Sequence, residues 1–302
     1  MSVVRRLAWG GAVCAVLAAL AVPALATNEA GPVYAWGNPA YQQNQLPDLT
    51  GAIAVSDGAQ HSLALKKDGT VVSWGDAIGK PPDGLADVKA ISASKVGHSL
   101  ALKKDGTVVA WGSNTMNGLD VPAGLSGVQA ISAGGEVNLA LKDDGTVVAW
   151  GYAARPALTV PADLTGVTAI AAGYDFGVAL KSDGTVVAWG DNSNHQTEVP
   201  AGLSGVTSIA AGVANGAAVK ADGTVAGWGD NGAGQLDITT QVAGVKQIAI
   251  GTFSVYGLKT DGTVVSWSPY CGVDATEAPS GLSSVTQISA GTCHALALIA
   301  TA

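Results

Sequence analysis

Short runs of apolar and β-branched residues alternate with glycine-rich turns along nearly the whole chain. One stretch shows the pattern clearly, with runs at residues 128–134, 138–142 and 146–150. The pair Asp144-Gly145 between the last two runs is typical of a tight hairpin, because glycine tolerates a positive φ. We therefore expect three short strands, A, B and C, followed by a short strand D around the next Val-Pro.

The same unit returns every 37 to 39 residues. Asp-Gly-Thr-Val opens six copies, and each copy ends at a Trp; a seventh Trp stands in an isolated C-type strand, residues 33–37. These Trp residues are Trp36, Trp74, Trp111, Trp150, Trp189, Trp228 and Trp267. A period near 39 with three or four strands is typical of a β-propeller blade, and an aromatic at a fixed strand position predicts packing between blades.

Seven A strands, seven B strands and seven C strands can be counted. The chain begins with a C strand and ends with a B strand, so residues 33–37 can pair with residues 294–299 and close a ring without an open sheet edge. We predict an all-β fold, a seven-bladed β-propeller that forms a single domain over residues 27–302. An open solenoid is the alternative, and it leaves the complementary ends unexplained.

Residues 1–26 have the three parts of a secretory signal peptide. Arg5 and Arg6 precede an apolar stretch over residues 7–22, and Ala24-Leu25-Ala26 has the small residues that a signal peptidase needs. We expect cleavage after Ala26 and a secreted or extracytoplasmic protein. An uncleaved N-terminal anchor is the alternative. The rest of the sequence predicts no membrane span, and we expect no membrane partner after cleavage.

Charged residues make up only 13% of the chain, against roughly 25% in ordinary soluble domains. The net charge is −8, and removal of Arg5 and Arg6 takes it to −10. An acidic chain is a poor ligand for nucleic acid, so we expect a protein partner and a monomer. Loss of Cys14 with the signal leaves Cys271 and Cys293, and an even number of cysteines in an oxidising compartment favours a disulfide.

The motif Ala-Leu-Lys-x-Asp-Gly-Thr-Val-Val-x-Trp-Gly resembles the regulator of chromosome condensation repeat, whose members form seven-bladed propellers. This resemblance covers nearly all of residues 33–302. Residues 186–200 and 204–212 further resemble the secreted propeller-type β-lactamase inhibitory protein of actinobacteria. That resemblance implies an acidic, non-enzymatic protein that binds its target enzyme through loops on one face of the ring. The inhibitor family presents aromatics from several A–B loops, and four of the matching loops here contain none.

An antiparallel meander places the A–B loops and the C–D loops on one face and the B–C turns on the other. The B–C turns are uniform, whereas the loops of the first face differ between copies, which predicts either a protein-binding surface or relaxed loops. Candidate contact residues are Tyr174, Asp175, Phe176, Phe253, Tyr256, Tyr152, Tyr270 and Arg155. Tyr256 alternatively belongs to its B strand. Cys271 and Cys293 fall on this face in neighbouring blades, so we predict that they form a disulfide.

Motifs for catalysis, metal binding or cofactor binding are missing from the sequence. His61, His98 and His294 open B strands at one repeat position, which predicts a structural role. We therefore expect a secreted, non-enzymatic propeller without cofactor that binds, or inhibits, another protein such as a secreted or cell-envelope enzyme. The alternatives are a β-lactamase inhibitor specifically, a hydrolase or lyase with its site in the central channel, and a nucleotide-exchange factor, which would need a cytoplasmic GTPase.

Overall fold

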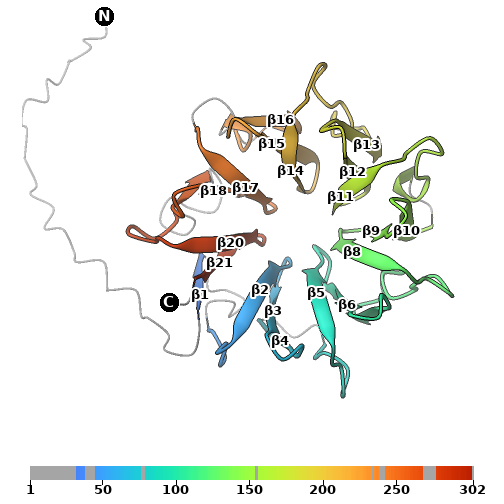
Figure 1. The fold of residues 1–302 in the computed structure, drawn as a ribbon, viewed down its shortest axis with the longest axis vertical. Coiled ribbons are helices and arrows are strands. Elements are labelled where there is room, and N and C mark those ends of the chain that lie inside the picture. The colour runs from blue at the N-terminus through green and yellow to red at the C-terminus, as the bar shows by residue number, and fades with distance from the viewer. Residues whose placement is uncertain are drawn as a thin grey trace, which may run out of the picture.

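Seven three-stranded antiparallel sheets surround a common axis in the computed structural model (Figure 1). The structure describes residues 32–37, 45–75, 79–153, 156–232, 234–237, 242–267 and 277–300. The strands of blades 1 to 3 are β2 (Ala52–Asp57), β3 (His61–Lys66), β4 (Val71–Gly75), β5 (Val88–Ala93), β6 (His98–Lys103), β7 (Val108–Gly112), β8 (Val128–Ala133), β9 (Val137–Lys142) and β10 (Val147–Gly151). Those of blades 4 to 6 are β11 (Val167–Ala172), β12 (Phe176–Lys181), β13 (Val186–Gly190), β14 (Val206–Ala211), β15 (Asn215–Lys220), β16 (Val225–Gly229), β17 (Val245–Ile250), β18 (Val255–Lys259) and β19 (Val264–Trp267).

Blade 7 combines both ends of the described chain. It consists of β20 (Val285–Ala290), β21 (His294–Ile299) and β1 (Val33–Gly37), and β1 pairs antiparallel with β21 from Val33 opposite Leu298 to Gly37 opposite His294. The Ile299 amide donates to the Pro32 carbonyl, as the Lys142 amide donates to Thr146 in blade 3. The predicted seven-bladed propeller and its closure by residues 33–37 are therefore confirmed.

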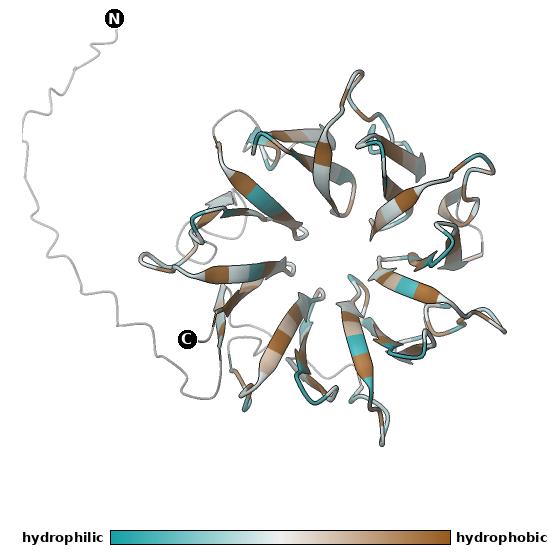
Figure 2. Ribbon diagram, in the orientation of Figure 1, coloured by the Kyte–Doolittle hydropathy of each residue, from teal (hydrophilic) through white to brown (hydrophobic). Residues whose placement is uncertain are grey.

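Each blade is ordered A, B, C from the axis outward. Each A strand contacts the A strands of its two neighbours around the ring, and the B strands are buried along nearly their whole length (Figure 1). Hydrophobic stretches recur on the strands of every blade (Figure 2). In blade 3, Leu139 and Leu141 of β9 pack with Trp189 of the next blade. Burial of such side chains against both neighbours explains the low charge of the sequence.

The predicted D strand is absent from the described connections between blades. Residues 113–127 and 191–205 are described throughout and contain no strand. The backbone there cannot offer a ladder of donors, because Pro122 and Pro200 have no amide hydrogen. The amides of the preceding valines are used locally, since Val121 donates to Leu119 and Val199 donates to Thr197. We keep the name C–D loop for the stretch that directly follows each C strand.

Polar side chains link neighbouring A strands at several junctions. Ser289, Ser56, Ser92 and Ser132 each accept a hydrogen bond from an amide in the A strand of the following blade, at 2.7 to 2.9 Å. Gln247 bridges blade 6 to blade 7, and Gln287 bridges blade 7 to blade 1. Each glutamine uses both the oxygen and the nitrogen of its side-chain amide. The serine position holds alanine in blades 4, 5 and 6. Within the described residues, no side-chain hydrogen bond joins the A strands at the junctions of blades 4 and 5 or blades 5 and 6.

Among the described residues, no helix is both long and apolar enough to span a bilayer.

Candidate protein-binding face

The A–B loops and the C–D loops lie together at one end of the ring, as predicted, and we call this end the loop face. Backbone hydrogen bonds tie the two loops of a blade to each other: Tyr152 donates to Glu136, Asp191 to Asp175 and Asp230 to Ala214. The loop face therefore combines residues from two separate stretches of each repeat.

The opposite face is uniform because the B–C turns of blades 1 to 6 have the same chemistry. In blade 3, Asp144 Oδ1 accepts hydrogen bonds from the amide and hydroxyl of Thr146, and Gly145 has a φ of 80°. The pKa of Asp144 is lowered to about 2 by hydrogen bonds from the Thr146 hydroxyl, then from the Thr146 amide and from the Lys142 ammonium. Lys142 Nζ lies 3.4 Å from Asp144 Oδ2, an exposed pair of the kind that adds little stability.

The A–B loops form a nearly continuous hydrogen-bonded ring. Backbone amides donate to the A–B loop of the following blade at five junctions, through the pairs Ala59–Ser94, Lys95–Gly134, Gly135–Gly173, Tyr174–Val213 and Thr252–Gly291. No such backbone bond joins the described A–B loops of blades 5 and 6 or those of blades 7 and 1. The loop face is thus held by direct links between blades at five of its seven junctions.

Three of the predicted contact residues are accessible on the loop face. Phe253 and Tyr152 are 44% and 40% exposed, and together with Ile53 they are the exposed large hydrophobic residues of the described chain. Tyr174 is half-buried, and its ring lies so close over Gly135 of blade 3 that a Cβ there would clash with it. Asp175 is half-buried beside Tyr174 in the same loop. The structure therefore brings Tyr152 and Tyr174 onto adjacent blades.

Phe176 and Tyr256 are wrong as contact residues, because both are fully buried. Phe176 is the first residue of β12 and pairs with Gly190, so its side chain enters the space between blades. Tyr256 lies within β18, and its ring meets Trp36 edge-on with 5.5 Å between the ring centroids. Burial raises the pKa of Tyr256 to about 12. Both rings stabilise junctions between blades rather than a surface.

Three other predicted residues, Arg155, Tyr270 and Cys271, lie outside the described residues. Cys293 is half-buried in the A–B loop of blade 7 and is disulfide-bonded. Its pairing with Cys271 stays a prediction.

The repeated histidines connect blades, in agreement with their predicted structural role. His61 Nε2 lies 3.0 Å from Ser99 Oγ, and His98 Nε2 lies 2.7 Å from Asn138 Oδ1, in each case across to the next blade. Desolvation lowers the pKa of His61 to about 4 and also lowers that of His98. Both imidazoles are therefore neutral near pH 7.

A Ser–His–Asp cluster lies at the junction of blades 7 and 1. Ser62 Oγ donates to Asp57 Oδ1 at 2.6 Å, and His294 Nε2 lies 3.2 Å from the same carboxylate oxygen. The serine hydroxyl thus donates to the aspartate, and its contact with His294 Nε2 is longer, at 3.5 Å. All three side chains are buried, so the arrangement differs from a catalytic triad, in which the histidine receives the serine proton.

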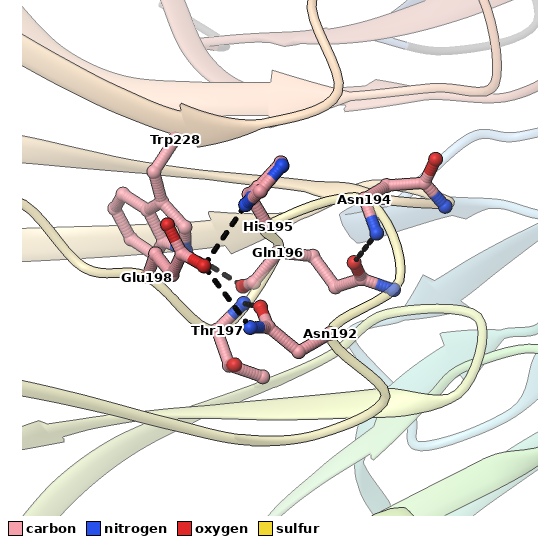
Figure 3. Close-up of polar contacts among 7 residues, drawn as sticks. All are labelled: Asn192, Asn194, His195, Gln196, Thr197, Glu198 and Trp228. Atoms are coloured by element: carbon pink, nitrogen blue, oxygen red, sulfur yellow. Dashed lines mark hydrogen bonds and ion pairs between the residues drawn. The ribbon is translucent and has the colours of Figure 1, made fainter.

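The C–D loop of blade 4 is closed by its own side chains (Figure 3). Asn192 Oδ1 accepts from the Thr197 amide at 3.0 Å, and Asn192 Nδ2 donates to Glu198 Oε1 at 3.2 Å. His195 Nδ1 lies 2.9 Å from the same Glu198 oxygen, and His195 has a φ of 63°. The loop also carries the Gln196 carbonyl, which accepts from Trp228 Nε1 of the next blade at 2.9 Å.

The same closure recurs in two other blades. Asn114 Oδ1 accepts from the Leu119 amide in blade 2, and Asn231 Oδ1 accepts from the Leu236 amide in blade 5, at 2.8 and 2.7 Å. The expectation that the C–D loops differ in every blade was therefore too broad. These three loops are variants of one conformation, whereas the connection that follows the C strand of blade 3 contains a 3-10 helix, Pro156–Leu158.

These recurring loops end the stretches that match a known repeat. The model of the regulator of chromosome condensation (RCC1) repeat matches residues 52–77, 88–117, 167–196 and 206–235. The chain is an RCC1-like repeat propeller. No curated protein matches it.

Several solved structures resemble this propeller over most of its length. Prp20p from Saccharomyces cerevisiae, described together with its binding to Gsp1p and histones, is 18% identical, with a TM-score of 0.71 over 90% of this chain and 92% of its own. Human WBSCR16 is 16% identical, with a TM-score of 0.65 over 89% and 100%. The CRINKLY ectodomain of the Arabidopsis thaliana receptor kinase ACR4 is 22% identical, with a TM-score of 0.60 over 80% and 89%. At these identities the likeness establishes the fold.

Sequence reasoning did not single out Lys95 of this RCC1-like propeller. Its Nζ donates to the Ile250 carbonyl at 3.3 Å, although Lys95 belongs to blade 2 and Ile250 to blade 6. These blades are not neighbours, so the side chain crosses the mouth of the central channel. Desolvation lowers the pKa of Lys95 to about 8, opposed by the negative charge of Asp57. Only the three-dimensional ring brings these residues together, and no local sequence pattern signals it.

A cavity of about 300 Å³ opens at the junction of blades 5 and 6 and was likewise missed. Its lining includes Val213 and Asn215 of blade 5, Asp230 and Gln235 of the blade 5 C–D loop, and Thr252 and Phe253 of blade 6. Within the described residues, no group of three His, Cys, Asp or Glu side chains is placed to hold a metal ion.

Proposed function

We propose that this RCC1-like propeller is an exported, non-enzymatic protein that binds another protein through its loop face. The observation that carries the proposal is the placement of the exposed aromatic residues Tyr152 and Phe253, with half-buried Tyr174 between their blades, on the face opposite the uniform Asp-Gly turns. Exposed aromatic side chains on a rigid scaffold are typical contact residues of protein interfaces.

Backbone bonds connect Tyr152 and Tyr174 into one arc. Tyr152 donates to Glu136, Glu136 donates to Tyr174, and Tyr174 donates to Val213. The bonded arc crosses blades 3 to 5, and Phe253 of blade 6 lines the same cavity as Val213 at its end. A surface held by direct bonds between blades loses little conformational entropy when it binds, which favours affinity.

Export is part of the proposal. It rests on Arg5 and Arg6, the apolar stretch that follows them and the small residues before Ala26. N-terminal sequencing of the protein recovered from the culture medium of an expressing bacterium should give Thr27 as the first residue. A protein that stays with the membrane fraction and keeps Met1 would support the uncleaved anchor instead.

A hydrolase or lyase in the central channel has less support. The Ser62–Asp57–His294 cluster is buried in a blade junction, and the mouth of the channel is crossed by Lys95. A nucleotide-exchange role requires contact with a cytoplasmic GTPase, and an exported protein is in a different compartment.

The binding proposal is tested by capture of proteins from the native secretome with the mature chain, residues 27–302. We expect Tyr152→Ala, Tyr174→Ala and Phe253→Ala to reduce capture of the same partner, each by roughly tenfold if the residue is a binding hot spot. Lys142→Ala, on the B–C turn face, is the matched control and should leave capture unchanged. Equal capture by all four variants would exclude the loop face.

Inhibition of β-lactamases is the specific candidate that follows from the resemblance of residues 186–212. It is tested by steady-state assays of a panel of β-lactamases with the mature chain. Inhibition that Tyr174→Ala weakens would identify the partner class. If no β-lactamase of the panel is inhibited, the β-lactamase candidate is wrong, and the general binding proposal is decided by the capture experiment.

A further inference from the structure

The cavity at the junction of blades 5 and 6 lies at one of the two junctions whose described A–B loops share no backbone hydrogen bond. Backbone bonds join the A–B loops on either side of it, from Tyr174 to Val213 and from Thr252 to Gly291. Neither Val213 nor Ala214 bonds to the described backbone of the blade 6 loop, and the cavity of about 300 Å³ lies between them. That volume is at the lower end of ligand sites, so it suits one long side chain or a small molecule.

Side-chain size explains the opening. At the junction of blades 3 and 4, the ring of Tyr174 covers Gly135. The corresponding residues at the junction of blades 5 and 6 are Thr252 and Val213. A threonine cannot cover the area that a tyrosine ring covers, so the space between the loops stays open.

The lining combines one aromatic face with one carboxylate. Phe253 is 44% exposed, and Asp230, which also lines the cavity, is exposed. The Asp230 carboxylate is held in place, because Oδ1 accepts from the Gly232 amide at 2.9 Å and Oδ2 accepts from Gln235 Nε2 at 3.2 Å. Each carboxylate oxygen has a second acceptor site. Both can therefore accept from a ligand without releasing the loop.

The surroundings are acidic. The connections that follow the C strands of blades 4 and 5, residues 191–205 and 230–244, contain four acidic residues and no Lys or Arg. These are Asp191, Glu198, Asp230 and Asp237. None of the described lining residues is a lysine or an arginine. The ammonium of Lys95 lies nearby, at the Ile250 carbonyl, so four carboxylates against one ammonium leave a net negative charge that favours a cation.

We propose that this cavity receives an arginine side chain of the protein partner. The proposal rests on the proposed function and names the chemistry of the partner at that site. A guanidinium is planar and stacks on an aromatic ring, and its fork of N–H donors fits the two oxygens of a carboxylate. Phe253 supplies the ring, Asp230 supplies the carboxylate, and the apolar stem of arginine packs on Val213.

The test uses the mature, full-length chain and the probe N-acetyl-arginine methylamide, with amide NMR shifts as the readout. We expect millimolar binding with shift changes confined to Val213, Ala214, Gly232, Thr252 and Phe253. The citrulline analogue, which has the same shape without the charge, should bind at least tenfold more weakly. Equal binding of the two probes, or shifts elsewhere on the ring, would overturn the proposal.

Two variants separate the contributions. Phe253→Leu keeps an apolar surface but removes the ring. Asp230→Asn keeps an acceptor for the Gly232 amide but removes the charge. Each variant should bind the arginine probe about threefold to tenfold more weakly. Lys142→Ala, on the B–C turn face, should leave binding of the arginine probe unchanged. If the arginine probe fails while Phe253→Ala still reduces capture of the partner, the arginine site is wrong and the binding function stands.

Discussion

The first position of each B strand shows how much one residue can change at a fixed place in a repeat. Histidine stands there in blades 1, 2 and 7, valine in blade 3, phenylalanine in blade 4 and asparagine in blade 5. His61 and His98 reach across to the next blade, whereas Phe176 fills the same space with an aromatic ring. The position is buried in all of these blades, so its chemistry sets the strength and the pH dependence of each junction.

His61 should make stability depend on pH. Its folded-state pKa of about 4 lies below the ordinary value of 6.5, so the unfolded chain binds the proton first as the pH falls. Stability from the neutral imidazole is fully present above pH 6.5 and is lost between pH 6.5 and about 4, by about 3 kcal/mol. Urea unfolding at a series of pH values should show this decline.

His61→Asn supplies the control, because asparagine occupies the same position in blade 5 and does not titrate. Asp57, His98 and His294 are the charged or titratable groups that act on His61, and they remain in the variant. We expect a shallower decline of stability in the variant over the same window. An identical pH profile in both proteins would show that other groups are responsible.

Burial of individual aromatics is the property that sequence reasoning predicted least well. Phe176 was placed in an A–B loop, but β12 begins with it, and a shift of one residue moves a side chain from one side of a strand to the other. Tyr152 and Phe253 follow the ends of strands, where no alternation constrains them, and both are exposed as expected. Residues at the boundaries of short strands are therefore the difficult cases.

At the scale of the element, three C strands hold the loop of the blade before them in place. The indole N–H of Trp150, Trp189 and Trp228 donates to a carbonyl 32 residues earlier, in Gly118, Ala157 and Gln196. The regular period of the sequence therefore also keeps this donor and this acceptor at the same spacing from blade to blade. The predicted packing role of the Trp residues is confirmed, and the hydrogen bond is an addition to it.

Trp150→Phe should destabilise the protein by about 1 kcal/mol more than Trp111→Phe does. Both rings are 5% exposed, so the two substitutions lose similar packing. Trp150 Nε1 donates to Gly118 at 3.1 Å, whereas the buried Trp111 Nε1 has no hydrogen-bond partner. A net hydrogen bond contributes about 1 kcal/mol. Denaturant unfolding of both variants measures the difference, and equal losses would mean that the indole bond adds nothing.

The strands themselves were predicted well from sequence, and the connections were not. Alternation, Asp-Gly turns and the fixed period identify A, B and C in each copy, because each strand depends on its own residues and its immediate neighbours. The D strand was inferred from the Val-Pro segment, whose apolar residues pack on the blade without pairing. Val121 and Val199 are examples, each with its amide used within two residues.

At the scale of the molecule, ring closure was predicted from the complementary ends alone. Long-range contacts such as Lys95 with Ile250, and the cavity between blades 5 and 6, depend on how seven blades meet around an axis. Such features arise from small differences in side-chain size at equivalent positions. The repeat pattern averages over those differences and therefore does not reveal them.

A circular permutant should fold. The break in the chain corresponds to a B–C turn of blade 7, since Ile299 donates to Pro32 as Lys142 donates to Thr146. We expect a chain with Ile299 joined to Val33 through Lys-Asp-Gly-Thr, and opened between Asp144 and Gly145, to keep the native circular dichroism spectrum and a similar Tm. Deletion of residues 33–37 should instead lower the Tm strongly, because it exposes an edge of β21 and removes Trp36. A permutant that does not fold would contradict the non-covalent closure.

The predicted Cys271–Cys293 disulfide would brace this closing blade. Intact mass of the secreted protein should be about 2 Da below that of the reduced chain, and a bridge of this loop length contributes on the order of 3 kcal/mol. Cys293→Ser should then lower stability by a similar amount. Two free thiols in the secreted protein would refute the pairing.

The uneven links between A strands have a consequence for how the ring moves. Serine and glutamine bonds join the A strands of blades 6, 7, 1, 2, 3 and 4 in succession. Among the described residues, such bonds are absent from the junctions of blades 4 and 5 and of blades 5 and 6. Local opening is easiest where few buried bonds must break. Slow collective opening should therefore concentrate between blades 5 and 6, away from the chain ends. A side chain held at that junction would slow amide exchange in both blades and stiffen the whole ring.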